Sequence, residues 1–195
     1  MTRVFRALTL AALATLALLV AGCGTVRNTI ADGEDSALML TGNDPVAYFT
    51  EKRAVKGSPA IKAARDGVTY RFVSEANRDR FLRDPARYEP AYAGFCASGA
   101  PYALKSAIGA DVFYIYEDRL YLYGGERTKK NWIMDAAQNV RLGDEYWERE
   151  TKDVPYRIQN AKRYTFKVPH YKTDAELDAE RERRRAAGTL TRDAQ

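Results

Sequence analysis

Two thiols, those of Cys23 and Cys96, carry the most specific chemistry in this chain of 195 residues. A thiolate is a strong nucleophile and a ligand for soft metals such as copper(I), so Cys96 is a candidate thiol site for metal or redox chemistry. It lies between Gly94 and Gly99 in an expected loop, where it could equally be buried as a small apolar side chain. The whole chain has one histidine and three methionines, so no cluster of three soft ligands stands out beside Cys96.

A second candidate surface is aromatic. The segment 111–124 is expected to fold back at Glu117-Asp118 as a β-hairpin, with Phe113, Ile115, Leu120 and Leu122 on one face. The other face carries Val112 and the four tyrosines Tyr114, Tyr116, Tyr121 and Tyr123. Such tyrosines either form covered cross-strand pairs or present a platform for a small ligand or a protein partner, and both alternatives stay open.

Several function classes find no support in the sequence. It contains no nucleophile elbow, no glycine-rich phosphate loop and no zincin helix, and His170, alone between Pro169 and Tyr171, is interpreted as incidental. Acidic residues are plentiful, but the sequence places no two of them in one cleft, as a carboxylate-dependent glycosidase would need. The net charge of +5, lowered further by removal of Arg3 and Arg6, is too small to indicate nucleic-acid binding.

The elements before the aromatic hairpin are a second hairpin and a helix. Asp66-Gly67 is expected to form a two-residue turn. The expected cross-strand pairs are Arg65 with Val68, Ala64 with Thr69, Ala63 with Tyr70, Lys62 with Arg71 and Ile61 with Phe72. Ser74 is the predicted N-cap of a helix over 75–83 that ends at Asp84-Pro85, with Phe81 and Leu82 facing the core.

After the aromatic hairpin, apolar residues at helical spacing predict one helix over about 126–140. Residues 148–172 lack this periodicity and are expected to form an extended arm. A capping box from Thr173 to Glu176 opens a last charged helix, which should close at Gly188. Pairs at helical spacing, Asp178 with Arg181 and Glu180 with Arg184, favour a solvated helix, or else a basic contact with anionic lipid or another anionic partner.

The N-terminus has the three regions of a secretory signal peptide: Arg3 and Arg6, an apolar run of about 14 residues, and small residues. The run is shorter than the roughly 20 residues that a helix needs to cross a bilayer. Its end, Val20-Ala21-Gly22-Cys23, resembles the bacterial lipoprotein signal. The resemblance implies cleavage before Cys23 and attachment of two or three acyl chains there, which hold a protein on a membrane essentially permanently.

The same resemblance implies a location. In Gram-negative lipoproteins an aspartate after the lipidated cysteine retains the protein at the inner membrane, and this chain has Gly24 there. We therefore expect an outer-membrane anchor that faces the periplasm. Lipidation of Cys23 would leave Cys96 as the only thiol of the mature chain, so no internal disulfide is expected.

A further resemblance covers about residues 41–147. Gly42-Asn43-Asp44-Pro45-Val46-Ala47-Tyr48-Phe49, then Gly67-Val68-Thr69-Tyr70-Arg71-Phe72-Val73-Ser74 and FLRDPARY from Phe81 to Tyr88, resemble the YHS domain, a short metal-associated module. Gly94-Phe95-Cys96-Ala97, Leu120-Tyr121-Leu122 and Trp147 are similar to its longer, stand-alone secreted form. The metal-associated members carry cysteine or histidine in slots that here hold Ala47, Val73 and Asn77, so the fold is expected to carry over and the metal site is not.

Together these patterns predict an α+β protein with two β-hairpins packed against short helices. Its expected parts are a cleaved signal peptide (1–22), a lipidated tether (23–37), a YHS-like domain (38–147), an extended arm (148–172) and a charged helix with its tail (173–195). We expect a non-catalytic binding or accessory module without a resident cofactor, held on the membrane by lipid, whose partner is a protein or a small ligand. The alternatives are copper handling or thiol redox chemistry at Cys96, and a carboxylate-dependent enzyme.

Overall fold

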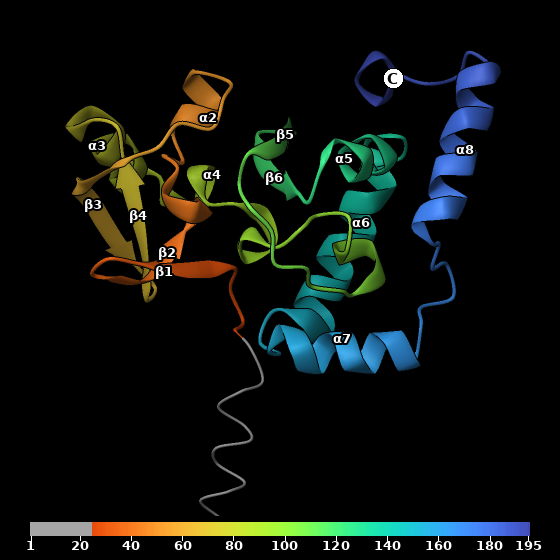
Figure 1. The fold of residues 1–195 in the computed structure, drawn as a ribbon, viewed down its shortest axis with the longest axis horizontal. Helices are drawn as coiled ribbons and strands as arrows, with labels where there is room; N and C mark the ends of the chain where they lie inside the picture. Colours follow the sequence, from red (N-terminus) through yellow and green to blue (C-terminus); the bar gives the residue numbers. More distant parts are fainter. Residues whose placement is uncertain (1–24) are drawn as a thin grey trace, which may run out of the picture.

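A four-stranded sheet organises the first lobe of the molecule (Figure 1). The structure, a computed structural model, describes residues 25–195, so Cys23 and the expected signal peptide lie outside the described residues. The strand order is β1-β2-β4-β3, in which β2 and β4 are parallel and the other neighbours antiparallel. The bounds are Thr29–Asp32 for β1, Asp35–Met39 for β2, Ser58–Arg65 for β3 and Val68–Phe72 for β4.

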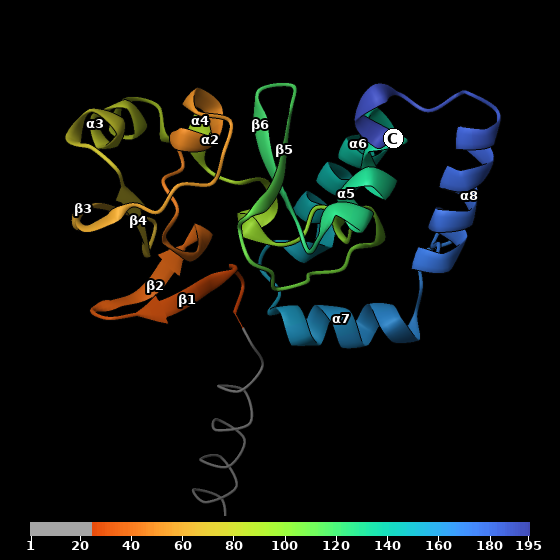
Figure 2. The same ribbon diagram turned by 45° about the horizontal axis from the view of Figure 1, so that its top comes forward.

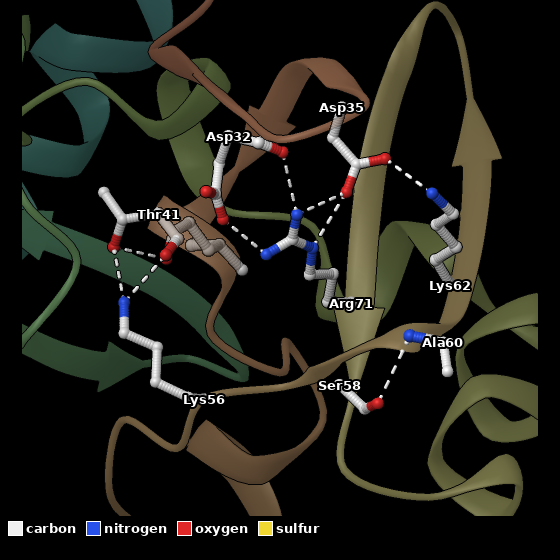
Figure 3. Close-up of polar contacts among 9 residues, drawn as sticks. Asp32, Asp35, Thr41, Lys56, Ser58, Ala60, Lys62 and Arg71 are labelled. Carbon is white, nitrogen blue, oxygen red and sulfur yellow. Dashed lines mark hydrogen bonds and ion pairs between the residues drawn. The ribbon is translucent and has the colours of Figure 1, made fainter.

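The expected tether is wrong for its described part, because β1 and the start of β2 lie within residues 25–37. Arg71 of β4 holds this hairpin: its guanidinium donates to the Asp35 carboxylate at 2.8 Å and to the Asp32 carboxylate at 2.5 Å (Figure 3). Lys62 of β3 donates to the other Asp35 oxygen at 2.9 Å. The residues of β1 are mostly exposed, and buried and exposed positions do not alternate along it. Backbone pairing with β2 and the ion pairs of Arg71 therefore place β1 in the sheet, because it has no apolar face to bury.

The predicted register of the β3–β4 hairpin is confirmed from Arg65–Val68 to Lys62–Arg71. Asp66 and Gly67 both have positive φ, 48° and 78°, as a tight hairpin turn requires. The expected pair of Ile61 with Phe72 is wrong, because the register shifts between Ser58 and Lys62 and Phe72 faces Ser58 instead. Pro59 lies in this bulge, where the missing N–H costs no ladder bond.

Short helices complete the first lobe. The helices are α2 (Ala47–Thr50), α3 (Glu75–Arg83) and α4 (Pro85–Tyr88), with a 3₁₀ turn η1 at Leu40–Gly42. The predicted cap is confirmed, since the Ser74 side chain accepts from the Asn77 N–H at 3.2 Å. Phe81 is fully buried, whereas Leu82, also expected in the core, is 54% exposed because only one side of α3 packs on the sheet.

The aromatic hairpin, β5 (Val112–Tyr116) and β6 (Arg119–Tyr123), has the predicted register, with Phe113 opposite Leu122 and Ile115 opposite Leu120. It stands between the two lobes, and each of its faces belongs to a different hydrophobic core (Figure 2). The aliphatic face packs with Tyr48, Phe72 and Phe81 of the first lobe. The tyrosine face packs with Trp132 and Ile133 of the second lobe.

Helices form the rest of the second lobe. The bounds are η2 (Ala91–Gly94), η3 (Ala100–Tyr102), α5 (Glu126–Ile133), α6 (Ala136–Tyr146), the π-helical turn η4 (Trp147–Thr151), α7 (Tyr156–Thr165), α8 (Asp174–Ala186) and η5 (Arg192–Ala194). The single helix expected over 126–140 is therefore two helices, since non-helical Asp135 breaks it (φ −136°, ψ 46°). The expected arm also contains α7, which has no apolar periodicity because its inner face is polar.

The last helix, α8, begins with the predicted capping box at Thr173 and Glu176 and closes before Gly188, whose φ is +66°. Asp178 lies 3.9 Å from Arg181, and Glu180 pairs with Arg184, as expected. The helix stands at one end of the molecule and touches α5 (Figures 1 and 2). Among residues 25–195, no helix has both the length and the apolar character needed to span a bilayer.

Candidate functional site

Cys96 is buried, with 4% of its surface exposed, so the buried-thiol alternative describes its environment. Its Sγ lies 3.0 Å from Ser98 Oγ, and its N–H donates to the Ser106 carbonyl at 3.0 Å. The turn before it, η2, is left-handed at Tyr92, Ala93 and Gly94. A Cβ at Gly94 would lie 2.9 Å from Met39 Sδ, so glycine allows this turn to pack closely on the first lobe.

A cavity of about 470 Å³ lies beside Cys96. Three segments line it: the loop 96–108, the helices α5 and α6, and the chain from Tyr164 to Leu177. The lining side chains are mostly neutral polar groups and aromatic rings, among them Ser98, Thr128, Trp132, Gln138, Asn139 and Tyr171. A cavity of this size and mixed character fits a small organic ligand that is held by hydrogen bonds and ring contacts.

Two lining residues carry buried polar atoms that lack a partner among the described residues. The Asn131 side chain is 4% exposed, and its Nδ2 donates to Asp178 Oδ1 at 2.8 Å while its Oδ1 has no partner. Trp132 Nε1, next along α5, is also buried without an acceptor. Both atoms are shielded from solvent, so they lie behind the cavity surface, where a molecule in the cavity would not reach them.

His170 lies on the same cavity. Its Nε2 is 2.8 Å from the Pro101 carbonyl, and its ring packs 5.9 Å from the rings of both Tyr102 and Tyr146. These contacts fasten the segment before α8 to the loop that follows Cys96. The histidine therefore has a packing role in the cavity wall.

The predicted tyrosine face is largely covered. Tyr121 and Tyr123 are 0% and 1% exposed, and the Trp132 ring lies 5.1 and 5.7 Å from theirs. Burial raises the pKa of Tyr121 to about 12 and also raises that of Tyr123. Only Tyr114 and Tyr116 are half-buried, which leaves no continuous platform of four rings.

The cover includes the tail of the chain, which sequence reasoning left without a role. Ala194 is fully buried in the same cluster, and Leu190 packs against it. The Tyr114 hydroxyl donates to Asp193 Oδ2 at 2.7 Å, which pins the tail to β5. The sequence of the tail does not predict a core segment, because it contains few apolar residues and Ala194 has a small side chain.

Ala47, Val73 and Asn77, which occupy the metal slots that the YHS resemblance implies, meet at one carboxylate. Asp44 is fully buried; its Oδ1 accepts from the Val46 and Ala47 N–H groups at 2.8 and 3.3 Å. Its Oδ2 accepts from the Val73 N–H at 2.9 Å and from Asn77 Nδ2 at 2.8 Å. Neutral N–H donors thus surround the carboxylate, an arrangement that does not fit a soft cation. In the part of the chain that the structure describes, no three His, Cys, Asp or Glu side chains are grouped so that they could hold a metal.

Lys105, which sequence reasoning missed, is fully buried. Its ammonium donates to the carbonyls of Val26, Lys152 and Val154 at 3.2, 3.1 and 2.8 Å. It also lies 5.1 and 5.0 Å from the ring centroids of Phe95 and Trp147. Burial lowers the pKa of Lys105 to about 8, against the opposing effect of the Asp153 charge. This one side chain fastens the start of the described chain to the turn before α7.

A second cavity, of about 360 Å³, lies between the lobes and is lined by the carboxylates of Asp66, Glu89 and Asp153. Tyr70, Tyr92 and Trp147 supply its aromatic wall. Burial raises the pKa of Glu89, although Arg65, 2.8 Å away, opposes this. The structure therefore brings together acidic residues that the sequence could not place in one cleft.

Comparison with protein-family models, with curated proteins and with solved structures finds no match to the chain. Its class is therefore defined by the fold and the site alone. The described residues form an α+β fold with a cavity beside Cys96, a cleft between the lobes and, on the two faces of one hairpin, two hydrophobic cores.

Proposed function

We propose that this protein is a lipid-anchored binding module of the cell envelope, related to the YHS domain and without catalytic activity. Lipid on Cys23 would hold it on the outer membrane with the folded part in the periplasm. The cavity beside Cys96 would take a small organic ligand, and the segment 164–177 together with α8 would close one side of it.

The cavity is the observation that carries the binding role. Its wall combines aromatic surface with neutral polar side chains such as those of Ser98, Thr128 and Gln138. A ligand with both ring surface and hydrogen-bonding groups would fit such a wall better than a purely apolar one. The tyrosine face supports this role less well, because α5 and the tail cover it.

Native mass spectrometry of the protein, isolated with detergent from its own membranes, tests the binding role. Gln138→Trp places a large ring on the cavity lining, whereas Ala137→Trp, its exposed neighbour on α6, does not touch the cavity. We expect a small-molecule adduct on the wild type and on Ala137→Trp, and its loss from Gln138→Trp. An adduct that survives equally in both variants would assign the ligand to another place, and a wild type without adduct would remove the proposal.

The anchor has its own test. The mass of the mature N-terminal peptide should show two or three acyl chains on Cys23, and Cys23→Ala should leave the protein unprocessed or unacylated. Density fractionation of the envelope should place the wild type with outer-membrane markers. A mature N-terminus without lipid would refute the anchor while leaving the cavity proposal intact.

The cleft between the lobes favours a second candidate, a carboxylate-dependent hydrolase. Glu89, with its raised pKa, would be the proton donor and Asp153 the second carboxylate. The test is turnover of chromogenic glycosides or esters by the wild type. Loss of this turnover in Glu89→Gln, with retention in the exposed control Glu75→Gln, would support the hydrolase. Absence of turnover across both substrate classes would remove it.

A further inference from the structure

The helix α7 has its polar face turned inward. Gln159, fully buried, donates to the Ala103 carbonyl at 2.8 Å. The Asn160 amide bonds the Lys105 backbone in both directions, at 2.9 and 2.5 Å. Arg163, also on this side, pairs with Glu150. Amides and charges therefore attach α7 to the body, where most surface helices would use apolar side chains.

The outer side of α7 and the chain just after it carry apolar residues instead. Ile158 is 45%, Tyr164 59% and Phe166 70% exposed. Within residues 25–195, seven large hydrophobic side chains are exposed. Three of them are these residues of α7 and the chain after it, and two, Val26 and Ile30, lie in residues 25–32, which we call the first strand region. In both views β1 and α7 lie along the same edge of the molecule (Figures 1 and 2). Most of the exposed large apolar residues thus belong to segments that lie along this edge.

The charge of α7 and of the chain just after it is positive, whereas residues 25–35 contain Arg27 and the acids Asp32, Glu34 and Asp35. Residues 156–172 contain five lysines and arginines and no aspartate or glutamate. Glu150, from the preceding turn, pairs with two of these cations, Lys162 and Arg163. Lys167 is exposed and lies over the Tyr171 ring at 4.6 Å. Exposed apolar and aromatic side chains among cations are the composition of a helix that lies in a membrane interface.

The position of Cys23 along the chain brings this edge to the membrane. The Tyr156 N–H, at the start of α7, donates to the Thr25 carbonyl at 3.1 Å. Thr25 follows Cys23 by two residues, which span at most about 7 Å. Each headgroup layer is about 5 to 7 Å thick. An acylated Cys23 would therefore hold the start of α7 against the headgroups, since no long tether separates the two.

We propose that α7, the segment up to Lys167 and the first strand region form a docking surface that lies on the anionic headgroups of the membrane holding Cys23. The surface is defined by Val26, Ile30, Ile158, Phe166 and Lys167. This inference rests on the proposed lipid anchor. It adds that the protein is held in one orientation, with β1 and α7 on the lipid and α3, in the first lobe, directed into the aqueous compartment.

Nitroxide labels on the full-length, acylated protein in vesicles test the orientation. The vesicles contain phosphatidylethanolamine and phosphatidylglycerol. The label is attached at Phe166→Cys. The matched control is Leu82→Cys, because Leu82 is an exposed apolar residue of α3. The wild type measures any labelling of buried Cys96. We expect the label at 166 to be immersed at the headgroup level and that at 82 to be in water. Equal exposure of both labels to water would overturn the proposal.

Charge provides a second readout in the same vesicles. A cation near an anionic surface contributes about 1 kcal/mol, so Lys167→Gln should lower the ratio of immersed to water-exposed label about five-fold. Arg83→Gln, an exposed cation on α3, should leave the ratio unchanged. Immersion that is independent of phosphatidylglycerol and of Lys167 would contradict the electrostatic part. Mass spectrometry of each preparation reports acylation of Cys23, so failure of the anchor is distinguished from failure of the docking surface.

Discussion

Replacing Lys105 by methionine removes a buried ammonium and leaves an unbranched apolar side chain that is one atom shorter. Three carbonyls, those of Val26, Lys152 and Val154, then lose their donor. A buried acceptor left without a partner costs about 1 to 3 kcal/mol, and Val26 is near enough to solvent to regain water. Burial of the ammonium has its own cost, as the lowered pKa shows, and the variant recovers this part. We therefore expect a net loss of about 3 kcal/mol in the free energy of unfolding.

Urea denaturation followed by circular dichroism measures this loss, and hydrogen exchange locates it. Amides of residues 25–28 and of the first turn of α7 should exchange faster in Lys105→Met, because the contact between the two segments is weakened. The matched control is Lys152→Met, whose ammonium pairs with Glu148 at the surface and should not change stability measurably. A difference between Lys105→Met and wild type below about 1 kcal/mol would refute the reasoning that a cation fastens these carbonyls.

Three further outcomes are expected. Asp44→Asn replaces one acceptor oxygen by an NH₂ group that faces N–H donors. Urea denaturation should show a free energy of unfolding lower by about 2 kcal/mol, whereas the exposed control Asp84→Asn should leave it unchanged. Lys62 and Arg71 hold the pKa of the Asp35 carboxyl below its usual 3.8, so its contribution to stability is present above that value and lost as pH falls through the lower folded pKa. Acid titrations should therefore show a shallower loss of stability for Asp35→Asn than for wild type, and parallel curves would contradict this. Wild type and Cys96→Ser should compete equally for copper(I), because the sulfur is buried; a higher affinity of the wild type would restore the soft-metal alternative.

The tyrosine hairpin shows how far strand periodicity can be used. Alternation predicted both its register and the partition of side chains between two faces, because successive side chains on a strand point to opposite sides. Alternation says nothing of what covers a face. Trp132 and the tail decide that, so Tyr121→Ala or Tyr123→Ala would open a cavity in a core and would report on stability rather than on partner binding.

The misplaced elements share one physical cause. β1 and α7 have few apolar residues facing the body. Arg71 holds the β1–β2 hairpin by ion pairs, and Gln159 and Asn160 hold α7 by hydrogen bonds. Prediction from hydrophobic periodicity cannot detect elements that are attached by polar contacts. The acids of the lobe cleft and the donors around Asp44 were also out of reach, since they come from segments distant along the chain.

Local properties of the chain therefore decided the α+β class, the tight turns, the helix caps and the alternation of the hairpins, because each depends on residues within a few positions of one another. The sequence alone also showed that Ala47, Val73 and Asn77 carry no thiolate or imidazole. Only the tertiary structure decided that Cys96 borders a cavity, that Lys105 joins two distant segments and that α7 begins beside Thr25. Those features require contacts between residues tens of positions apart, whose partners are selected by packing of the whole chain rather than by local sequence.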